Sequence, residues 1–362
     1  MHELELAYRD LCAARRPEDV FGWLAAGETA VRLQQLDGAA ERLAAVVDPS
    51  RFDWDLDLRE IATAAATRLA DLRRQARTRI ELGVYGRDGD DPAAGLRVEL
   101  PDRVVVLEST IGAGDLATVY GGRCDGPEPV TVAVKIANDP ADHDLMQQEA
   151  RVLRRFQANP GSQSKHLPEL LATFKTADGR LGLVLRYLDG IDLVTLRERF
   201  PDGVPAMHAI WICARVLSAI GFAHRLGVVH GNVEPTHILV RPRDHNAFLI
   251  DWSYAAIEPD RSGERFRVRN DEYSAPEVGL PEPPTPAADI FSIGKCMVYI
   301  LGGDVATGAL PADVDARLQR FLQAMMLASS RQRPRDAWEL HSVLKSLRGE
   351  IFGQTGFLEL NV

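Results

Sequence analysis

Apolar residues recur at helical spacing through the first part of the chain. One such face comprises Leu4, Leu6, Ala7 and Leu11. A second helical run covers residues 58–82, where apolar positions alternate with arginine-rich ones and neither Gly nor Pro interrupts the pattern. The periodicity stops at residues 86–95, which are polar and contain Gly and Pro. We therefore predict a small all-α bundle of three or four helices over residues 1–85 and a linker over residues 86–99.

Short apolar and β-branched runs replace the helical pattern after residue 100. Residues 103–107 and 132–134 are typical of strands, whereas residues 206–226 predict one long buried helix. This order predicts a region of strands and then helices over about residues 100–346. The predicted fold class is therefore α+β, preceded by the all-α bundle.

A polar loop lies between apolar runs just after the predicted long helix. Residues 230–237 follow the apolar pair at 228–229, precede an apolar run at 238–240, and contain Gly and Pro. A third apolar run, residues 248–250, leads directly into Asp251. We expect the loop and Asp251 to reach the same end of these strands and to line one cleft.

This stretch resembles the catalytic loop and metal-binding turn of the eukaryotic-type protein kinases, whose pattern is His-Arg-Asp, Lys-Pro, Asn-Ile-Leu and Asp-Phe-Gly. His230, Pro235 and Asp251 match that pattern. The family's catalytic aspartate, its phosphate-facing lysine and its second metal-binding residue are replaced by Asn232, Glu234 and His237. The resemblance implies a two-lobed fold, with a small lobe over about residues 100–188 and a large lobe over about residues 189–346. It also implies a pseudokinase, in which the catalytic positions of the loop are altered and Asp251 is the remaining metal ligand.

A glycine-rich stretch, a lysine and a glutamate follow one another in the order that the family shows. Gly112 and Gly114 lie in the glycine-rich stretch, Lys135 ends a strand, and Glu149 lies in the next helix. Backbone without a Cβ can approach phosphates, and a lysine held by a glutamate can neutralise them. Two structural alternatives stay open. A hairpin that needs positive φ would also explain the glycines, and the charged residues would also form a plain ion pair.

The resemblance implies an ATP site with Mg²⁺ at Asp251. The predicted residues of this site are Ile111, Gly112, Gly114, Val119, Ala133, Lys135, Glu149, Leu185, Tyr187, Leu188, Leu239 and Asp251. Asn232 cannot accept a proton, and a histidine nitrogen at position 237 suits Mg²⁺ poorly. We therefore expect weak ATP binding that Mg²⁺ improves little.

The end of the kinase-like region also follows the family pattern. Residues 275–277 match the end of the activation segment, and the resemblance implies that Glu277 pairs with Arg333. Asp289 matches the start of a buried helix, and an internal column is expected from His230, Trp252, Leu153 and Asp289. The segment between Asp289 and Arg333 is short for the family, which predicts a trimmed substrate-docking region. Residues 347–362 are predicted to be a tail that packs on its own lobe rather than pairing as a strand with a partner.

The bundle carries a second resemblance. A helical pattern at residues 36–47, the loop Asp48-Pro49-Ser50 and the following long helix resemble a J domain, whose two helices are joined by a His-Pro-Asp loop. The histidine and the aspartate that would engage an Hsp70 chaperone are missing, which argues against Hsp70 as a partner. The alternative, which we prefer, is a plain helical bundle that presents a docking surface.

Composition narrows the function classes further. The chain of 362 residues is long for one domain, and its 46% hydrophobic and 26% charged residues are typical of a globular protein. A net charge of −10 without a basic cluster argues against a nucleic-acid partner. The four cysteines form no C-x-x-C pair. Without a recognisable signal segment or membrane-length apolar run, we expect a cytoplasmic protein with no membrane partner.

Three functions stay open. The first, which we favour, is a pseudokinase that acts as a nucleotide-responsive scaffold or regulatory adaptor for a protein partner in intracellular signalling. The second is a low-activity or atypical ATP-dependent serine/threonine kinase, with Glu234 as a displaced base, or a nucleotidyl transferase. The third is a purely structural interaction protein with no nucleotide. Titration with ATP separates the third function from the others, and incubation with labelled ATP separates the first from the second.

Overall fold

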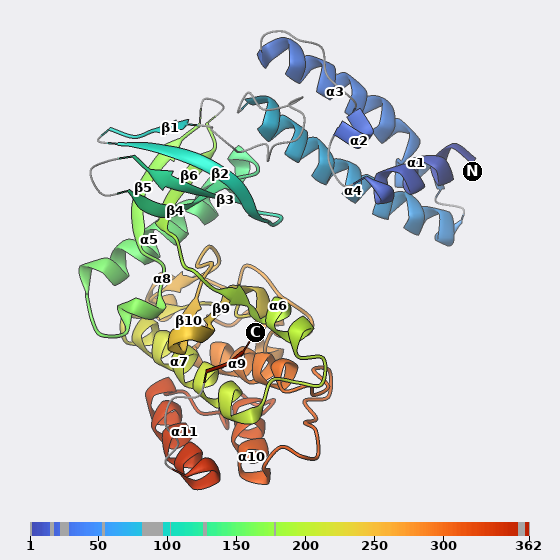
Figure 1. Ribbon diagram of the computed structural model, residues 1–362. Coiled ribbons are helices and arrows are strands. Elements are labelled where there is room, and N and C mark those ends of the chain that lie inside the picture. Colours follow the sequence, from blue (N-terminus) through green and yellow to red (C-terminus); the bar gives the residue numbers. More distant parts are fainter. Residues whose placement is uncertain are drawn as a thin grey trace. The chain divides into compact units, whose positions relative to one another are not determined.

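The computed structural model divides the chain into two compact units (Figure 1). The first comprises Met1–His143 and Ala172–Val184, and the second comprises Asp144–Leu171 and Leu185–Val362. The structure describes residues 2–14, 18–21, 29–52, 55–81, 97–101, 103–125, 129–176, 179–353 and 359–361. Residues 86–96 of the predicted linker lie outside the described residues.

In the described part of residues 1–81, four α-helices form the bundle. They are α1 (His2–Ala13), α2 (Glu18–Phe21), α3 (Thr29–Val46) and α4 (Leu56–Glu81). One face of α4 is almost completely buried and comprises Ala62, Ala65, Leu69 and Leu72. It packs in one cluster with Leu4 and Leu11 of α1. The spacing of three and four residues explains the helical prediction, and the all-α bundle is confirmed.

The connection between α3 and α4 is a compact turn. Pro49–Phe52 form a 3₁₀ turn, and Phe52 packs in the bundle core. The Asp48 carboxylate accepts hydrogen bonds from the backbone N–H (2.9 Å) and the hydroxyl (2.8 Å) of Ser50. These hydrogen bonds hold the pKa of the Asp48 carboxyl below its usual range. Asp48 therefore stabilises the turn at the position where a J domain would have its histidine.

A six-stranded sheet follows the bundle in the chain. Its strands are β1 (Arg97–Glu99), β2 (Val104–Ala113), β3 (Ala117–Cys124), β4 (Val130–Ala137), β5 (Leu170–Lys175) and β6 (Leu181–Arg186), in the order β1-β2-β3-β4-β6-β5. β1 lies inside the range predicted as linker and corrects that boundary. Val98 is buried and pairs with Val105 of β2, but a strand of three residues is too short to give a periodic pattern.

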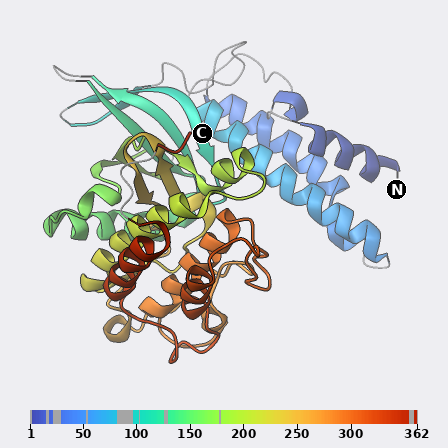
Figure 2. The same ribbon diagram turned by 60° about the horizontal axis from the view of Figure 1, so that its bottom comes forward.

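The second unit is mainly helical (Figures 1 and 2). Its longer helices are α5 (His143–Ala158), α6 (Leu193–Arg199), α7 (Ala206–Arg225), α9 (Pro286–Ile300), α10 (Ala316–Met325) and α11 (Ala337–Phe352). α7 contacts α9 and α11, as the prediction of a central buried helix requires. Among the described helices, α7 alone is long and apolar enough to cross a membrane. However, 78% of its apolar window is buried in the protein, as in a core helix.

Short elements frame the polar loop. They are β7 (Ile191–Asp192), β8 (Val228–Val229), β9 (Ile238–Arg241), β10 (Asn246–Leu249), β11 (Ala256–Ile257) and α8 (Pro259–Ser262), with 3₁₀ turns at Ser164–His166, Pro235–His237, Pro242–Asp244 and Pro276–Gly279. β10, β9 and β7 form one sheet, and β11 pairs with β8 in another. The loop at residues 230–237 therefore runs from β8 to β9, and β10 leads to Asp251.

The large lobe extends further than predicted. α11 continues to Phe352, whereas the prediction starts a tail at residue 347. Leu347 is buried and keeps this turn of the helix packed, and Gly353, at φ +69°, ends the helix as a left-handed residue commonly does. The tail therefore begins at Gly353.

Two other features of the large lobe agree with expectation. Leu360 of the tail is 3% exposed and lines one groove with Gly190 and Arg241, so the tail packs on its own lobe. Between α9 and α10, the chain forms turns and an isolated bridge between Asp304 and Ala309. This is the region predicted to be trimmed.

Candidate functional site

A buried carboxylate fixes the start of the polar loop. Asp289, at the beginning of α9, accepts hydrogen bonds from the backbone N–H of His230 (2.8 Å) and of Gly231 (2.9 Å). Its Oδ2 also lies 2.9 Å from Nε2 of His224. Gly231 has φ +76°, and a Cβ there would lie 3.2 Å from the Tyr254 carbonyl oxygen, so this backbone conformation favours glycine over a larger residue. The loop therefore leaves β8 in one defined direction.

Aromatic packing links this loop to the turn after β10. The ring of His230 lies 4.5 Å from that of Trp252, which makes an edge contact of 4.8 Å with Phe156 on α5. His230 Nδ1 accepts from the Asn232 N–H (3.3 Å), so Nε2 carries the hydrogen and donates it to the Ile250 carbonyl (3.0 Å). Both His230 and Trp252 are completely buried. Together with Asp289, they are three of the four residues of the expected column, and Phe156 adds to it. The fourth, Leu153, is completely buried on α5.

We expect the protein to lose stability as the pH falls from about 6.5 toward 4. Burial lowers the pKa of His230 to about 4, and burial lowers that of His166 similarly to about 4. Below pH about 6.5 the unfolded chain therefore binds protons that the folded chain does not, which favours unfolding by up to roughly 3 kcal/mol for each histidine.

Urea unfolding at pH 7 and at pH 4.5 measures this loss. His230→Gln should remove about half of the pH dependence, because His166 retains its contribution. An equally steep loss in His230→Gln and in the wild-type chain would show that the loss comes from other groups.

The three altered loop positions have an ordered arrangement. His237 Nδ1 donates to the backbone carbonyl of Asn232 (2.8 Å). The other ring nitrogen, Nε2, lies 3.6 Å from Oε1 of Glu234 and 3.7 Å from Oδ2 of Asp251. In the neutral ring, Nε2 carries a lone pair, whereas in the imidazolium it carries a proton that faces both carboxylates. In either state, imidazole stands where the family pattern places an amide oxygen.

Glu234 is held by two neighbours that the sequence gave no reason to select. Its Oε1 accepts from the Thr236 hydroxyl (2.6 Å), and its Oε2 accepts from the Asn270 side-chain amide (2.8 Å). Asn270 belongs to the segment that precedes residues 275–277. Its role depends on a tertiary contact between this segment and the loop, and such contacts leave no periodic signal in the sequence.

Ser253 connects the turn at Asp251 to α5. Asp251 has φ +60°, a conformation that is uncommon outside glycine. The Ser253 hydroxyl lies 2.7 Å from Asp251 Oδ1 and 3.0 Å from Glu149 Oε2, and Glu149 Oε1 accepts from the Trp252 N–H (3.2 Å). Glu149 is 1% exposed. Ser253 occupies the glycine position of the Asp-Phe-Gly pattern, and this departure was the available signal for a role that the prediction missed.

Comparison with known proteins agrees with this geometry. Residues 105–346 match the family model for the protein kinase domain. The chain belongs to the protein kinase family. The chain is 30% identical over 217 residues to serine/threonine-protein kinase PknH of Mycobacterium bovis, a match that covers 58% of this chain and 34% of PknH.

Two further relatives show the same pattern of partial coverage. Serine/threonine-protein kinase PknE of Mycobacterium tuberculosis is 30% identical over 217 residues, which are 58% of this chain and 36% of PknE. Serine/threonine-protein kinase PknK of Mycobacterium bovis is 29% identical over 201 residues, which are 54% of this chain and 17% of PknK. The match therefore covers about a third of PknH and of PknE and 17% of PknK. The family match confirms the two-lobed fold, but it begins at residue 105 and does not bear on the resemblance to a J domain.

In the first unit, one face of the sheet carries several of the residues predicted to bind nucleotide. Val119 of β3 is opposite Gly112 of β2 and opposite Lys135 of β4. Ala133 lies two residues before Lys135 and therefore faces the same side. Lys135 is 6% exposed. It belongs to the first unit and Glu149 to the second, so the pairing of these two residues stays a prediction.

The glycine-rich loop does not need its glycines for its own fold. Neither Gly112 nor Gly114 is among the described residues with positive φ, which removes the alternative that a hairpin requires them. A Cβ at Gly112 would lie 3.9 Å from Val119, and one at Gly114 would lie 3.8 Å from the Ala117 carbonyl oxygen, both ordinary contacts. Ile111 is 46% exposed. The absence of Cβ atoms is therefore compatible with close approach of a ligand such as a phosphate group.

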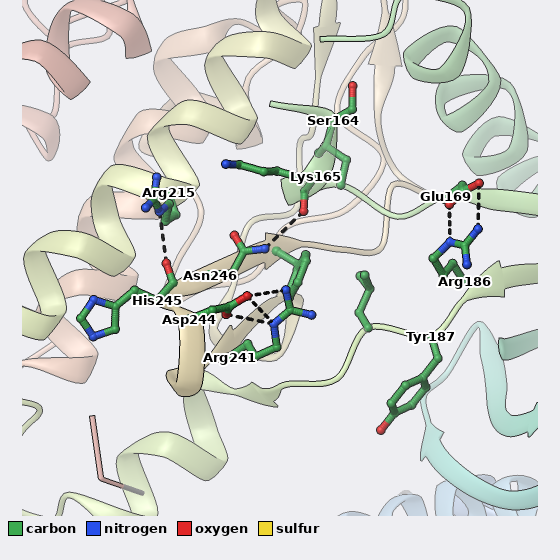
Figure 3. A pocket seen from close by; sticks show the side chains of 13 residues that line it. Ser164, Lys165, Glu169, Arg186, Tyr187, Arg215, Arg241, Asp244, His245 and Asn246 are labelled. Atoms are coloured by element: carbon green, nitrogen blue, oxygen red, sulfur yellow. Dashed lines mark hydrogen bonds and ion pairs between the residues drawn. The ribbon is translucent and has the colours of Figure 1, made fainter. Parts of the chain in front are cut away.

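The remaining predicted nucleotide residues lie in the second unit. Leu239 in β9 is opposite Phe248 of β10, and Leu185 is the penultimate residue of β6. Tyr187 and Leu188 follow β6, and their side chains line a pocket with Glu169 and Phe248 (Figure 3). Those side chains face this pocket, so the predicted contribution of Tyr187 and Leu188 to an adenine site rests on their backbone groups.

The side chains near Asp251 offer few oxygen ligands for Mg²⁺. Protein kinases use ATP with Mg²⁺, which prefers oxygen ligands. Among the described residues, no group of three or more His, Cys, Asp or Glu side chains could hold a metal ion. Asp251 is the carboxylate at the family's metal position, and His237 offers nitrogen beside it. Asp251 is therefore the carboxylate that would hold a metal ion together with the phosphates of ATP.

Proposed function

We propose that this kinase domain binds ATP weakly and has lost most of its capacity for phosphoryl transfer. The observation that carries the proposal is the rebuilt loop, in which His237 is fixed by the Asn232 carbonyl and faces Glu234 and Asp251. In phosphoryl transfer, the loop aspartate accepts the proton of the substrate hydroxyl, and an amide at position 232 cannot do so. ATP would supply the phosphoryl group, and Lys135 would neutralise its phosphates.

The Mg²⁺ dependence of ATP binding is expected to be small. Imidazole at position 237 is a poor ligand for Mg²⁺, and Glu234 adds negative charge beside the site. Calorimetry should show that Mg²⁺ changes the Kd for ATP by less than about tenfold. His237→Asn, which restores an amide oxygen, should increase the effect of Mg²⁺, whereas Lys135→Ala should weaken ATP binding with or without Mg²⁺. Tight binding that strictly requires Mg²⁺ in the wild-type chain would contradict this prediction.

The proposed biological role is that of a scaffold or regulatory adaptor for a protein partner. The buried network around Asp289, His230 and Trp252 supports it, because these contacts fix the shape of the lobe without performing phosphoryl transfer. The bundle would add a docking surface. With Asp48-Pro49-Ser50 in place of His-Pro-Asp, we do not propose Hsp70 as the partner.

A low-activity serine/threonine kinase is the second candidate. PknH, PknE and PknK are named as serine/threonine-protein kinases, and these comparisons support the second candidate better than the first. In this candidate, Glu234 is the displaced base. Its two oxygens already accept hydrogen bonds from Thr236 and Asn270, so proton transfer would require one of them to be released.

Labelled ATP separates the candidates. With ATP labelled at the γ-phosphate, the impaired domain should incorporate no more label than an Asp251→Ala variant. Incorporation that is lost in Asp251→Ala and in Lys135→Ala would establish the active kinase instead. Incorporation from ATP labelled at the α-phosphate would identify nucleotidyl transfer, and the absence of any thermal shift with ATP would identify a structural protein without nucleotide.

A further inference from the structure

A pocket of about 380 Å³ lies in the second unit, away from the polar loop, beside residues 186–188 (Figure 3). Its walls come from the 3₁₀ turn at Ser164–His166, from α7, and from β9, β10 and the turn between them. Four of its side chains are cationic, namely Lys165, Arg186, Arg215 and Arg241, and two are acidic, namely Glu169 and Asp244. The pocket therefore carries an excess of positive charge in a chain whose net charge is −10.

The two acidic side chains neutralise two of the cations. Arg186 pairs with Glu169 through Nε and Oε2 at 2.5 Å, and Arg241 pairs with Asp244 through Nη2 and Oδ2 at 2.7 Å (Figure 3). The hydrogen bond from Arg241 lowers the pKa of the Asp244 carboxyl, so this pair stays charged on both sides. The excess positive charge is therefore carried by Lys165 and Arg215.

Lys165 and Arg215 have no carboxylate partner within 4.0 Å among the described residues. Arg215 is half-buried on α7, and its Nε donates to the His245 carbonyl (3.1 Å), which orients the guanidinium and leaves its two Nη groups for other acceptors. Lys165 is exposed, and Figure 3 shows its side chain directed toward the side on which Arg215 lies. An oriented guanidinium beside an ammonium is an arrangement that binds carboxylates and phosphates.

Both cations act on the same buried histidine. After burial, the charge of Arg215 and then that of Lys165 lower the pKa of His166, whose Nδ1 lies 3.1 Å from the Ala247 carbonyl oxygen. His166 therefore stays neutral at neutral pH and adds no charge. Since Arg215 and Lys165 influence one ring, an anion between them would interact with both.

The other wall of the pocket is apolar. Leu167 is 4% exposed and Phe248 is 2% exposed, whereas Tyr187, which also lines the pocket, is 37% exposed. An occupant that uses the whole pocket therefore combines an anionic group with an apolar one. The two ion pairs add alternating charges to the pocket lining, which an extended peptide can contact together, whereas a single inorganic ion can contact only one pair at a time.

We propose that this pocket is a docking site for an acidic peptide segment of a partner protein. A carboxylate side chain of the segment binds Arg215 and Lys165, and a neighbouring apolar side chain contacts Tyr187 and Leu188. The proposal rests on the proposed function in one respect, because it supplies the surface through which a scaffold binds its partner. A docking site would serve an active kinase equally well.

A peptide array tests the proposal directly. The labelled full-length chain is applied to an array of nine-residue peptides with a fixed central Glu, Asp, phosphoserine or Lys and mixed residues elsewhere. We expect binding to the Glu and Asp sets that exceeds binding to the Lys set by roughly tenfold or more, with apolar residues enriched beside the acid. Lys165→Glu should abolish this preference, and Arg215→Leu should reduce it by a similar factor.

Arg243→Leu is the matched control. Arg243 is an exposed arginine on the same turn that pairs with Asp189 and does not line the pocket, so its loss removes one positive charge without touching the site. Binding in Arg243→Leu should equal wild-type binding. Lys165 is exposed, so Lys165→Glu should melt like the wild-type chain, and loss of binding in this variant would not result from unfolding.

Three results would overturn the proposal. They are equal binding to the Glu and Lys sets, a loss in Arg243→Leu as large as that in Lys165→Glu, and complete displacement of bound peptide by inorganic phosphate at millimolar concentration. The last result would assign the pocket to free anions. Failure of the impaired-kinase proposal is distinguishable, because label incorporation from ATP is measured separately and would leave the array result unchanged.

Discussion

Asn232→Asp combined with Glu234→Lys and His237→Asn is expected to raise phosphate incorporation by about 10²- to 10⁴-fold over the wild-type chain, the range of a positioned general base. The substitution at position 232 is nearly isosteric. The contacts of Asn232 with His230 and His237 use its backbone N–H and carbonyl, so a carboxylate can replace the amide without disturbing them. The loop would keep its path and gain the missing proton acceptor.

The other two substitutions remove obstacles to ATP and Mg²⁺. Glu234→Lys replaces a carboxylate with the cation that the family places at this position, at the loss of hydrogen bonds from Thr236 and Asn270. His237→Asn restores an amide oxygen at the family's second metal position, directly before β9. The three changes should act together, because each concerns the same transferred phosphate.

Two controls make this prediction specific. Asp251→Ala in the restored background should abolish the gain, since Asp251 stands at the family's metal position. Asn159→Asp makes the same chemical change on the exposed residue after α5, where Asn159 donates to the Arg155 carbonyl (2.9 Å), and should change nothing. If the wild-type chain already incorporates as much label as the restored variant, and loses it in Asp251→Ala, the loop is catalytic as it stands.

Patterns along the chain were sufficient to predict the bundle and the kinase fold. The bundle face of Ala62, Leu69 and Leu72 repeats at helical spacing, and the succession of Gly112, Lys135 and Glu149 is specific to one family, so local pattern was sufficient for both. Boundaries were less predictable. β1 is too short to show periodicity, and α11 continues past residue 346 because Leu347 packs in the lobe, which only the tertiary structure shows.

The environment of the altered positions depends on tertiary contacts. Asn270 holds Glu234 from a distant segment, and the Ser253 hydroxyl reaches Glu149 on α5, although neither contact has a sequence motif. The cationic pocket depends in the same way on Lys165 and Arg215, which are separated along the chain and scattered among ordinary surface charges. Sequence patterns therefore identified which positions had changed, and the structure shows what holds the new side chains.

Glu277→Ala is expected to destabilise the kinase domain by roughly 3 to 5 kcal/mol, as breaking a buried ion pair does. Arg333 Nη1 lies 2.6 Å from Glu277 Oε1, and Nη2 lies 3.2 Å from Oε2, which is a bidentate geometry. Arg333 is 2% exposed and Glu277 is 7% exposed. Removal of the carboxylate would leave the guanidinium buried without a counter-charge, and the melting temperature should fall by roughly 6 to 20 °C.

The size of the effect is tested by a matched exposed pair. Glu169→Ala breaks the same kind of bond, but the side chains of Arg186 and Glu169 are 48% and 43% exposed, so water can replace the partner. The expected loss is about 1 kcal/mol or less. Similar melting temperatures for Glu277→Ala and Glu169→Ala would show that burial does not decide the strength of the Glu277–Arg333 pair.

The double variant Glu277→Ala/Arg333→Ala distinguishes an unpaired buried charge from lost packing. Arg333 also donates to the carbonyl groups of Ala287 (2.7 Å) and Leu327 (2.9 Å), so Arg333→Ala alone should be destabilising too. If the unpaired charge is the main cost, the double variant should lose less stability than the two single variants lose together, by about 1 to 3 kcal/mol. This is the range of coupling between residues in contact. Strict additivity would contradict this explanation. Because this pair lies outside the polar loop, Glu277→Ala should also reduce peptide docking through loss of the folded lobe, whereas Asn232→Asp should leave docking unchanged.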